Sequence, residues 1–383
     1  MRADHARVSS NVLIVGGGLA AQRAVETLRA RDHRGSIRVV CGEPEPPYDR
    51  PPLSKELGSA PFRAPEWYAE HDVELLLGRR AARLEAALRR VLLEDGEPLP
   101  YDELIVATGA HPRRLPMLAG RPNVHVLRTL ADAVGLRAAL APGVRLAIVG
   151  AGFIGQEVAA TARGLGAEVT MIEASEVPLA HVLGPRLGGW FADLHREEGV
   201  QVELGAALVQ ALPAVAGAAV SELALADGRR IASDVVLVAI GVVPETRWLA
   251  GSPLADGVAV DHGARTAIPH VYGAGDVVRG CEHWEPAARL GAAAARSILG
   301  LPAAPPAPES FWSDQYGLRI QLVGEARGAD AVEVDGVPGS RDFTALLSRR
   351  GALIGALLVG RPRELPHWRR RLADAARPER TAA

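Results

Sequence analysis

Apolar runs and segments of helical periodicity alternate along the chain, and one arrangement of them occurs twice. In each copy an apolar run leads into a glycine-rich turn, an amphipathic segment and a second apolar run. This order is typical of a strand–helix–strand unit in a parallel sheet. The expected strand, helix and strand are residues 12–15, 19–31 and 37–40 in the first copy and 145–149, 154–164 and 168–172 in the second.

Residues 103–108 and 233–240 form two further apolar runs, and each ends in small residues or at a glycine. Short apolar runs with such ends are typical of buried parallel strands. We expect them where the chain passes between domains. Two or three domains are expected, since 383 residues exceed what a single hydrophobic core usually holds.

The last part of the chain has a different pattern. Residues 302–308 contain four prolines and predict a stiff linker. Beyond them, residues 318–323 alternate between polar and apolar, and the apolar runs 343–348 and 352–359 flank an Arg-Arg-Gly turn as the arms of a hairpin would. The pattern predicts a small α+β domain at this end.

Composition excludes some classes of function. The net charge of −2 gives no overall attraction to nucleic acid or to a membrane surface. The longest apolar stretches reach about half the length needed to cross a bilayer, so no membrane-spanning helix is expected. Residues 1–10 leave no room for a secretory segment before the first strand, which makes the cytoplasm the expected location.

Cysteine and lysine are both rare. The two cysteines, Cys41 and Cys281, are too far apart in sequence for a CxxC redox pair or a zinc cluster, so we expect inert thiols and no metal site. Lys55 is the only lysine among 43 basic residues. A site that needs a compact ammonium group would resist replacement by the planar guanidinium of arginine, which makes Lys55 a candidate functional residue.

The first glycine-rich turn runs from Gly16 through Gly18 to Ala21, after an expected strand and at the start of an expected helix. Small residues there let the backbone approach a pyrophosphate, and the helix start adds partial positive charge. Glu43, at the end of the next strand, would accept hydrogen bonds from a ribose. A tight turn without a ligand is the alternative.

The second turn, Gly150-Ala151-Gly152-Phe153-Ile154-Gly155, has the complete dinucleotide-binding pattern, and Glu173 closes the following strand. A carboxylate at that position favours the free ribose hydroxyls of NADH over the 2′-phosphate of NADPH. Glycines alone do not determine which dinucleotide each turn binds.

Four longer motifs carry a more specific resemblance: PPYDRPPLSK (residues 46–55), Ala-Thr-Gly (107–109), Gly-Ala-Gly-Asp (273–276) and FWSDQYG (311–317). Together they resemble the NADH-dependent ferredoxin reductases of oxygenase electron-transfer chains, which belong to the pyridine nucleotide-disulfide oxidoreductase superfamily. The similarity extends over nearly the whole chain. It implies an α/β fold with two Rossmann-like dinucleotide-binding domains and a small α+β C-terminal domain. The implied boundaries are 1–112 with 242–308 for FAD, 113–241 for NADH and 309–383 for the C-terminal domain.

The resemblance also assigns residues. To FAD it assigns Gly16, Gly18, Glu43, Arg50, Arg128 and Asp276, and to NADH it assigns Gly150, Gly152, Gly155, Glu157 and Glu173, with a weaker match at Glu282. The remaining expected cofactor contacts are Ala21, Pro51, Ala107, Thr108, Gly109, Ile154, Gly241, Gly275 and Trp284.

The resemblance implies that the catalytic residues are Lys55, Glu157 and Trp312. The lysine of this motif lies near the reactive edge of the flavin in the family, where a compact cation stabilises the charge of reduced FAD. Glu157 resembles a glutamate placed to meet that lysine or the nicotinamide, and Trp312 and Gln315 match positions that cover the rings. An exposed lysine, a helix-surface glutamate and a core aromatic are the alternatives.

The function implied is a reductase that moves hydride from NADH to FAD and then passes single electrons to an iron–sulfur ferredoxin serving an oxygenase. The chain departs from the family at Glu245, where the family often has asparagine, and it lacks the redox cysteine of the disulfide-using relatives. An NADH oxidase or quinone reductase, and a redox-sensing interaction flavoprotein, are the alternative functions. The basic tail, residues 361–380, is either a partner-docking segment or a solvated helix face.

Overall fold

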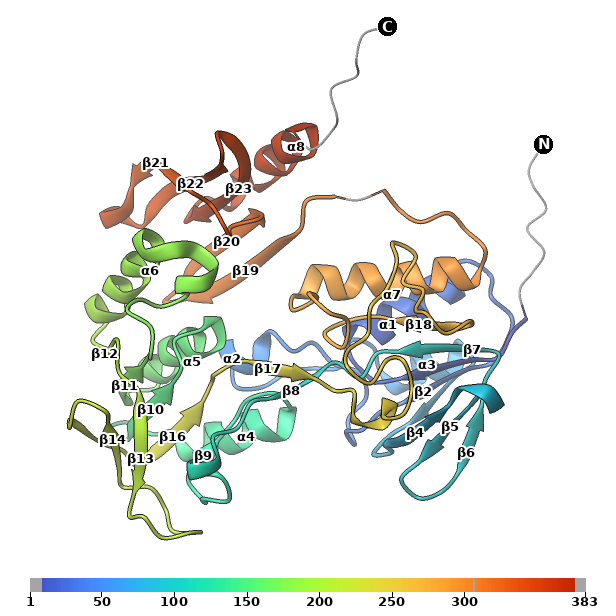
Figure 1. Ribbon diagram of the computed structural model, residues 1–383, viewed down its shortest axis with the longest axis horizontal. Coiled ribbons are helices and arrows are strands. Elements are labelled where there is room, and N and C mark those ends of the chain that lie inside the picture. Colours follow the sequence, from blue (N-terminus) through green and yellow to red (C-terminus); the bar gives the residue numbers. More distant parts are fainter. Residues whose placement is uncertain (1–8, 306, 376–383) are drawn as a thin grey trace, which may run out of the picture. The chain divides into compact units, whose positions relative to one another are not determined.

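The computed structural model describes residues 9–305 and 307–375, and it divides into two compact units (Figure 1). In the described chain, unit 1 consists of residues 9–49, 59–111 and 242–305. Unit 2 consists of residues 50–58, 112–241 and 307–375. The chain therefore changes unit inside the PPYDRPPLSK motif. The three-domain boundaries expected from the sequence remain a prediction.

Unit 1 is built on a parallel sheet in which the strand order is β18-β7-β1-β2-β3. Its strands are β1 (Val12–Val15), β2 (Ile37–Val40), β3 (Val73–Leu76), β7 (Glu103–Val106) and β18 (Val271–Gly273). Around it are α1 (Leu19–Ala30), α3 (Pro65–Glu70), α7 (Trp284–Ile298), an antiparallel sheet of β4 (Ala81–Glu85), β5 (Arg90–Leu93) and β6 (Pro98–Pro100), and the strand pair β8 (Ala110–Pro112) and β17 (Val242–Pro244). The four residues of β1 are all buried, as a central parallel strand requires.

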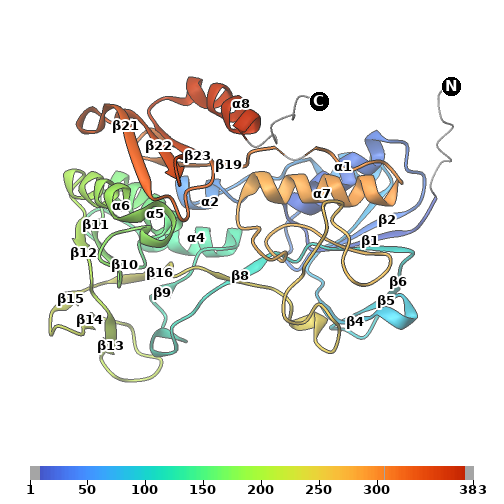
Figure 2. The ribbon, with the colours of Figure 1, turned by 45° about the horizontal axis from the view of Figure 1, so that its top comes forward.

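Helices α1 and α7 run side by side in unit 1 (Figures 1 and 2). Small residues make this possible: Ala20 and Ala24 on α1 and Ala294 on α7 are buried. Gly291 marks the closest approach, because a Cβ atom there would lie 2.1 Å from the backbone oxygen of Ala20. The helix that follows the first glycine turn is thereby packed closely against α7.

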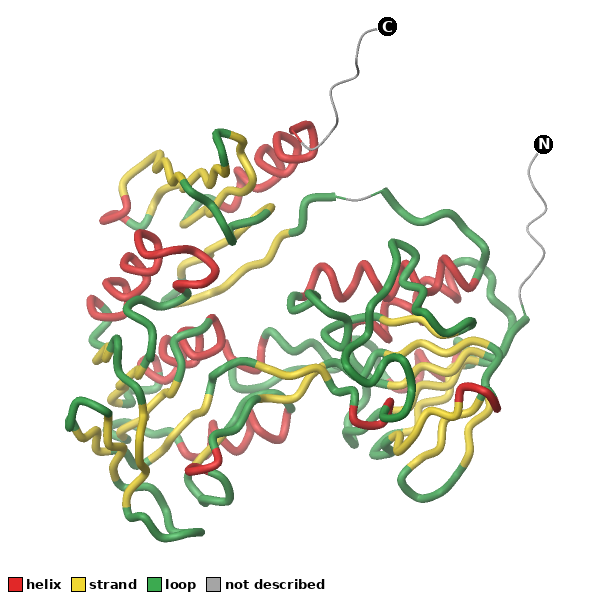
Figure 3. Tube along the Cα trace, viewed as in Figure 1, coloured by secondary structure: helices red, strands yellow, loops and turns green. Residues whose placement is uncertain are grey.

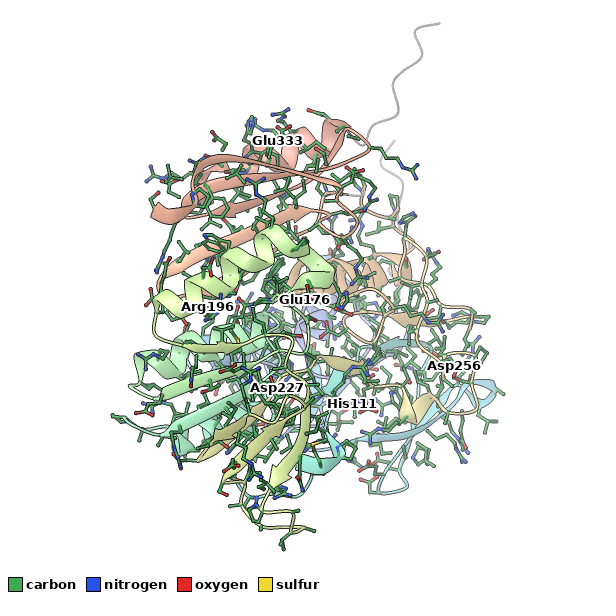
Figure 4. The ribbon with its side chains drawn as sticks, turned by 60° about the vertical axis from the view of Figure 1, so that its left-hand side comes forward. His111, Glu176, Arg196, Asp227, Asp256 and Glu333 are labelled. Carbon is green, nitrogen blue, oxygen red and sulfur yellow. The ribbon has the colours of Figure 1, made fainter. Side chains whose placement is uncertain are left out.

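Unit 2 contains a second parallel sheet, with the strand order β12-β11-β10-β16-β9. Its strands are β9 (Val124–His125), β10 (Arg145–Val149), β11 (Glu168–Ile172), β12 (Gln201–Glu203) and β16 (Val235–Val238). The other elements of this part are α2 (Pro52–Lys55), α4 (Leu130–Ala139), α5 (Phe153–Gly164), α6 (Ala180–Glu197) and an antiparallel sheet of β13 (Leu208–Leu212), β14 (Glu222–Leu225) and β15 (Arg230–Ala232). Arg196 of α6 pairs with Asp193, and Asp227, in the turn between β14 and β15, pairs with Arg229. Figure 4 labels Arg196 and Asp227.

The C-terminal part of unit 2 is a five-stranded antiparallel sheet followed by a helix (Figure 3). In sheet order its strands are β19 (Ser310–Gln315), β20 (Leu318–Gly324), β23 (Ala352–Val359), β22 (Asp342–Arg349) and β21 (Ala331–Val337), and the helix is α8 (Leu365–Ala375). Leu187 and Phe191 of α6 share one apolar core with Phe343 and Leu357 of this sheet. Because of this shared core, β19 is fixed within unit 2.

The fold class expected from the sequence is confirmed. The strands at 12–15, 37–40, 145–149 and 168–172 have the predicted bounds, and Arg349 pairs with Ala352 across the predicted hairpin. The runs 103–108 and 233–240 give shorter strands: residues 107 and 108 lie in the loop after β7, and residues 233–234 and 239–240 lie outside β16 on its two sides. Residues 302–305 have no helix or strand, and residue 306 of the expected linker lies outside the described chain, as do residues 376–380 of the basic tail. No helix in the described ranges is long and apolar enough to span a membrane.

We expect Gly291→Ala to destabilise unit 1 by about 3 kcal/mol, because the added methyl group forces two packed helix backbones apart. Gly135→Ala is the matched control: Gly135 is exposed inside α4, and a Cβ atom there meets nothing within 4 Å. That change is expected to stabilise by about 0.5–1 kcal/mol. Calorimetric unfolding of the two variants provides the measurement, and a Gly291→Ala protein as stable as the native one would contradict the packing argument.

Candidate functional site

The first glycine turn connects β1 to α1 and combines two different needs for glycine. Gly16 has φ +116°, and a Cβ atom there would lie 2.0 Å from the backbone oxygen of Ala107, so glycine is required by the protein itself. At Gly18 a Cβ atom would meet nothing within 4 Å. Gly18 is also the N-cap of α1 and supplies no side-chain cap. A pyrophosphate fits this open space at the helix start, and Ala21 is buried one turn further on.

Other expected FAD contacts lie at the carboxyl edge of the same sheet. Glu43 follows β2, residues 107–109 follow β7, and Gly275 and Asp276 follow β18, which pairs with β7. Carboxyl ends of parallel strands meet at one edge, so these residues share it with Gly16. The Tyr48 hydroxyl donates a hydrogen bond to Glu43 Oε2 at 2.5 Å. A tyrosine of the PPYDRPPLSK motif therefore holds the carboxylate expected to bind the ribose, a role that the sequence did not indicate.

The backbone after β7 is bonded to the segment that carries Glu245. The Thr108 hydroxyl donates to the Glu245 carbonyl at 2.7 Å, and the Glu245 amide donates to the Gly109 carbonyl at 2.9 Å. The Arg247 guanidinium, 2.6 Å from the Glu245 carboxylate, holds the pKa of that carboxyl below its usual range. Glu245, where the chain departs from the family, thus forms a local ion pair with Arg247. The contacts of its main-chain atoms with Thr108 and Gly109 do not depend on its side chain.

Trp284 and Glu282 differ in their surroundings. Trp284 begins α7, and its indole N–H donates to Asp49 Oδ1 at 2.8 Å. The Arg23 guanidinium lies 5.6 Å from the centre of the same indole ring. Glu282 is exposed. Trp284 is therefore held by two contacts within unit 1, whereas the Glu282 side chain lies on the surface.

The second glycine turn, between β10 and α5, also contains glycines that the protein itself requires and one glycine that faces open space. A Cβ atom at Gly150 would lie 2.5 Å from the Ala239 oxygen, and one at Gly155 would lie 2.3 Å from the Gly150 oxygen. At Gly152, in contrast, a Cβ atom meets nothing within 4 Å, and Ile154 beside it is 39% exposed. The open position again precedes a helix start, which suits a second pyrophosphate.

Glu173 is held by the backbone on both of its oxygens. Oε2 accepts from the Ala151 amide and Oε1 from the Ser175 amide, each at 2.8 Å. An ionised carboxylate has about four acceptor positions, so two remain for ribose hydroxyls. Gly241 follows β16, which pairs with β10 on the side away from β11. It has φ +94°, and its carbonyl accepts a hydrogen bond from the Arg113 amide at 2.9 Å.

Arg50 and Arg128, both expected at the flavin nucleotide, are brought together within unit 2. The Arg50 guanidinium donates to the Arg128 carbonyl. The Arg128 amide donates to Asp132 Oδ2 at 3.1 Å, and Asp132 also belongs to the capping box that begins α4. The Arg128 backbone is therefore fixed on both sides. Pro51 precedes α2 as its N-cap residue.

Lys55 and Glu157 form a buried ion pair. Lys55 Nζ lies 2.8 Å from Glu157 Oε1, and the side chains are only 16% and 6% exposed. Lys55 ends α2 and Glu157 lies in the second turn of α5, so the pair joins the PPYDRPPLSK motif to the helix of the second glycine turn. Of the two partners expected for this glutamate, the lysine is the one that it contacts within unit 2, and the catalytic role of the pair stays a prediction.

Two serines that sequence reasoning did not single out complete the surroundings of Glu157. The Ser313 hydroxyl donates to Glu157 Oε1 at 2.7 Å, and the Ser54 hydroxyl donates to Oε2. Each serine lies inside one of the two motifs that carry the resemblance. Serine hydroxyls have no characteristic spacing, however, and only membership of those motifs could have indicated them.

Trp312 and Gln315 lie on opposite faces of β19, because side chains alternate along a strand. Ser313 and Gln315 are buried, at 0% and 1% exposure, whereas Trp312 is half-buried. The Arg319 guanidinium lies 5.9 Å from the centre of the Trp312 ring. Gln315 therefore points into the core with Ser313, and Trp312 points away from it.

The cysteines have the surroundings of inert thiols. Burial raises the pKa of the Cys41 thiol to about 12, with a further contribution from Glu43. Its Sγ lies against Gly17, at 2.6 Å from where a Cβ atom of that residue would be. Cys281 is also buried. Within residues 9–305 and 307–375, no group of three or more His, Cys, Asp or Glu side chains is arranged to hold a metal ion.

Comparison with known proteins identifies the family. A family model described as "Pyridine nucleotide-disulphide oxidoreductase" matches residues 10–291, and one described as "Reductase C-terminal" matches residues 310–383. The chain belongs to the pyridine nucleotide-disulphide oxidoreductase family. Membership of this family confirms that the protein is an oxidoreductase and that FAD and NAD(H) are its cofactors.

Relatives within this oxidoreductase family cover most of the chain. The 5,5'-dehydrodivanillate O-demethylase ferredoxin reductase subunit of Sphingobium sp. (strain NBRC 103272 / SYK-6) is 36% identical over 96% of this chain and 94% of its own. The biphenyl dioxygenase system ferredoxin–NAD(+) reductase component of Paraburkholderia xenovorans is 40% identical over 85% of this chain and 83% of its own. The reductase in the covalent putidaredoxin reductase–putidaredoxin complex superposes with a TM-score of 0.92, at 30% identity, over 96% of this chain and 94% of that one. The resemblance expected from the four motifs is confirmed.

We expect substitutions of the two open glycines, Gly18 and Gly152, to weaken the binding of different nucleotides. Gly18→Ala should lower FAD affinity and Gly152→Ala should lower NADH affinity, each by about tenfold or more, because a methyl group in the open space prevents close approach of a phosphate. Neither change should lower the thermal stability of the cofactor-free protein, since among the described residues none besides the chain neighbours lies within 4 Å of the added atom. Isothermal titration measures both affinities. Each variant controls for the other, and equal loss of both nucleotides in either variant would contradict the assignment.

We expect Glu157→Gln to expose the only lysine of the chain to acylation. Loss of the carboxylate charge removes the ion pair, so the free amine of Lys55 should react about tenfold faster with an amine-directed reagent. Mass spectrometry of the peptide that contains residue 55 gives the rate without interference from other lysines. Glu168→Gln, on an exposed position of β11, is the control and should leave the rate unchanged. An unchanged rate in Glu157→Gln would contradict the pairing.

Proposed function

We propose that this protein is an NADH-dependent, FAD-containing reductase that delivers electrons to an iron–sulfur ferredoxin serving an oxygenase. The observation that carries the proposal is the pair of strand–turn–helix cradles, one in each unit, in which Gly18 and Gly152 leave open space at a helix start. Two such cradles suit two dinucleotides, and the names of the relatives support ferredoxin as the electron acceptor.

The chemistry of the proposal belongs to the cofactors. When bound, FAD accepts hydride from NADH and releases electrons one at a time. The chain itself supplies binding and charge: the glycine turns receive the pyrophosphates, Glu43 and Glu173 the riboses, and Lys55 the positive charge that reduced FAD needs. Because the chain has only two cysteines, both buried, it offers no disulfide as an intermediate electron store.

The proposal extends to the residues and boundaries expected from the sequence. Lys55, Glu157 and Trp312 are proposed as catalytic, the Lys55–Glu157 contact of 2.8 Å being the strongest support. FAD is assigned to residues 1–112 and 242–308, NADH to 113–241, and the C-terminal domain to 309–383. A cytoplasmic location is proposed on the sequence pattern alone.

The test compares electron acceptors for one preparation of the purified flavoprotein with NADH. We expect a ferredoxin from the same host to be reduced much faster than oxygen or a quinone, and we expect the long-wavelength absorbance formed with NADH under anaerobic conditions to decay within seconds. Rapid quinone or oxygen reduction without ferredoxin reduction would identify an oxidase or quinone reductase instead. Absorbance that persists for many minutes would identify a redox sensor.

A further inference from the structure

A buried hydrogen-bonded network begins at Tyr316 and ends at the second glycine turn. The Tyr316 hydroxyl lies 2.7 Å from His195 Nδ1, and His195 Nε2 lies 3.2 Å from Gln156 Oε1. Gln156 Nε2 donates to the Ala151 carbonyl at 2.9 Å. Burial lowers the pKa of His195 to about 4, so the imidazole is neutral near pH 7. One consistent set of protons follows: the hydroxyl donates to Nδ1, and Nε2–H donates to Gln156.

A second branch of this network leads to the ion pair. Gln315 Nε2 donates to Ser313 Oγ at 3.1 Å and lies 3.5 Å from Gln156 Oε1. Because Ser313 Oγ accepts a hydrogen bond from the Gln315 amide, the Ser313 hydroxyl proton points away from that amide. The hydroxyl donates this proton to Glu157 Oε1, 2.7 Å away. The neighbouring amide thus sets the direction of the Ser313 hydroxyl.

Glu157 therefore has three donors, two from α2 and one from β19. Lys55 and Ser313 reach Oε1, and Ser54 reaches Oε2. Ser54 and Ser313 are 5% and 0% exposed, so water does not substitute for them readily. A carboxylate that shares its charge with two hydroxyls neutralises the nearby ammonium less completely, and it is held in one orientation.

We propose that Ser313, with Ser54, is a positioning residue that holds the Glu157 carboxylate and thereby sets the position and effective charge of Lys55. Through β19 the C-terminal domain then takes part in the reduction of FAD by NADH. The inference rests on the proposed function for the role of Lys55, and it assigns to Ser313 no contact with either cofactor.

The test uses the complete FAD-loaded protein with Ser313→Ala and two companions. Ser313→Thr keeps a hydroxyl and should restore native behaviour. Ser310→Ala makes the same change on the same strand but removes a hydroxyl that accepts from Arg369 at 2.6 Å, so it is the matched control.

We expect Ser313→Ala to lower the two-electron midpoint potential of bound FAD. A tenfold loss of preference for the reduced form corresponds to about 30 mV for a two-electron couple. Reduction by NADH in stopped flow should slow by about tenfold while the Kd for NADH is unchanged, because a hydrogen bond to a charged group is lost without loss of a substrate contact.

Protein labelled with ¹⁵N-lysine gives one lysine side-chain signal, and this signal should move in Ser313→Ala but not in Ser310→Ala.

The proposal is overturned if Ser313→Ala retains the native potential, reduction rate and lysine signal. If Ser313→Ala does not fold, Ser54→Ala removes the hydroxyl on the other oxygen of Glu157, and a native potential in that variant overturns the proposal equally. None of these measurements involves ferredoxin. A protein that shows the shifts but does not reduce ferredoxin would remove the proposed acceptor and leave the positioning role, whereas the reverse result would remove only the positioning role.

Discussion

The buried carboxylate of Glu157 is the constraint on which the arrangement of unit 2 depends. An ionised carboxylate away from water is costly unless it is paired and hydrogen-bonded. Lys55, Ser54 and Ser313 meet this requirement from α2 and β19, although they lie far from Glu157 in sequence. The short motif segment, residues 50–58, is therefore part of unit 2 even though the residues on both sides of it belong to unit 1.

The two glycine turns show that one residue type serves two purposes. Gly16, Gly150 and Gly155 are required by the protein, because each would place a Cβ atom against a backbone oxygen. A Cβ atom at Gly18 or Gly152 would meet no described residue other than its chain neighbours within 4 Å, so their small size has meaning only for something that approaches from outside. The open positions are thus better evidence for nucleotide binding than the crowded ones.

The carboxylates expected at the two riboses are held in different ways. Glu43 receives a tyrosine hydroxyl, whereas Glu173 receives two backbone amides and ties its own glycine turn to the end of β11. In both cases the carboxylate is fixed before a ligand arrives, which reduces the entropy lost on binding. The residue at 245, where the chain departs from its family, keeps its contacts with Thr108 and Gly109 because it makes both of them through its own main-chain atoms.

Sequence by itself determined the two strand–turn–helix units and the C-terminal hairpin, and the resemblance offered Lys55 as one of two expected partners of Glu157. Periodicity and glycine conformation are local properties, so they can be identified in a short stretch of chain. The tertiary structure decided that Ser54, Ser313 and Tyr48 serve the carboxylates, and that Trp312 and Ser313 lie on opposite faces of β19. Those contacts join side chains from different motifs and elements, and a hydroxyl finds its acceptor only when packing brings the two together.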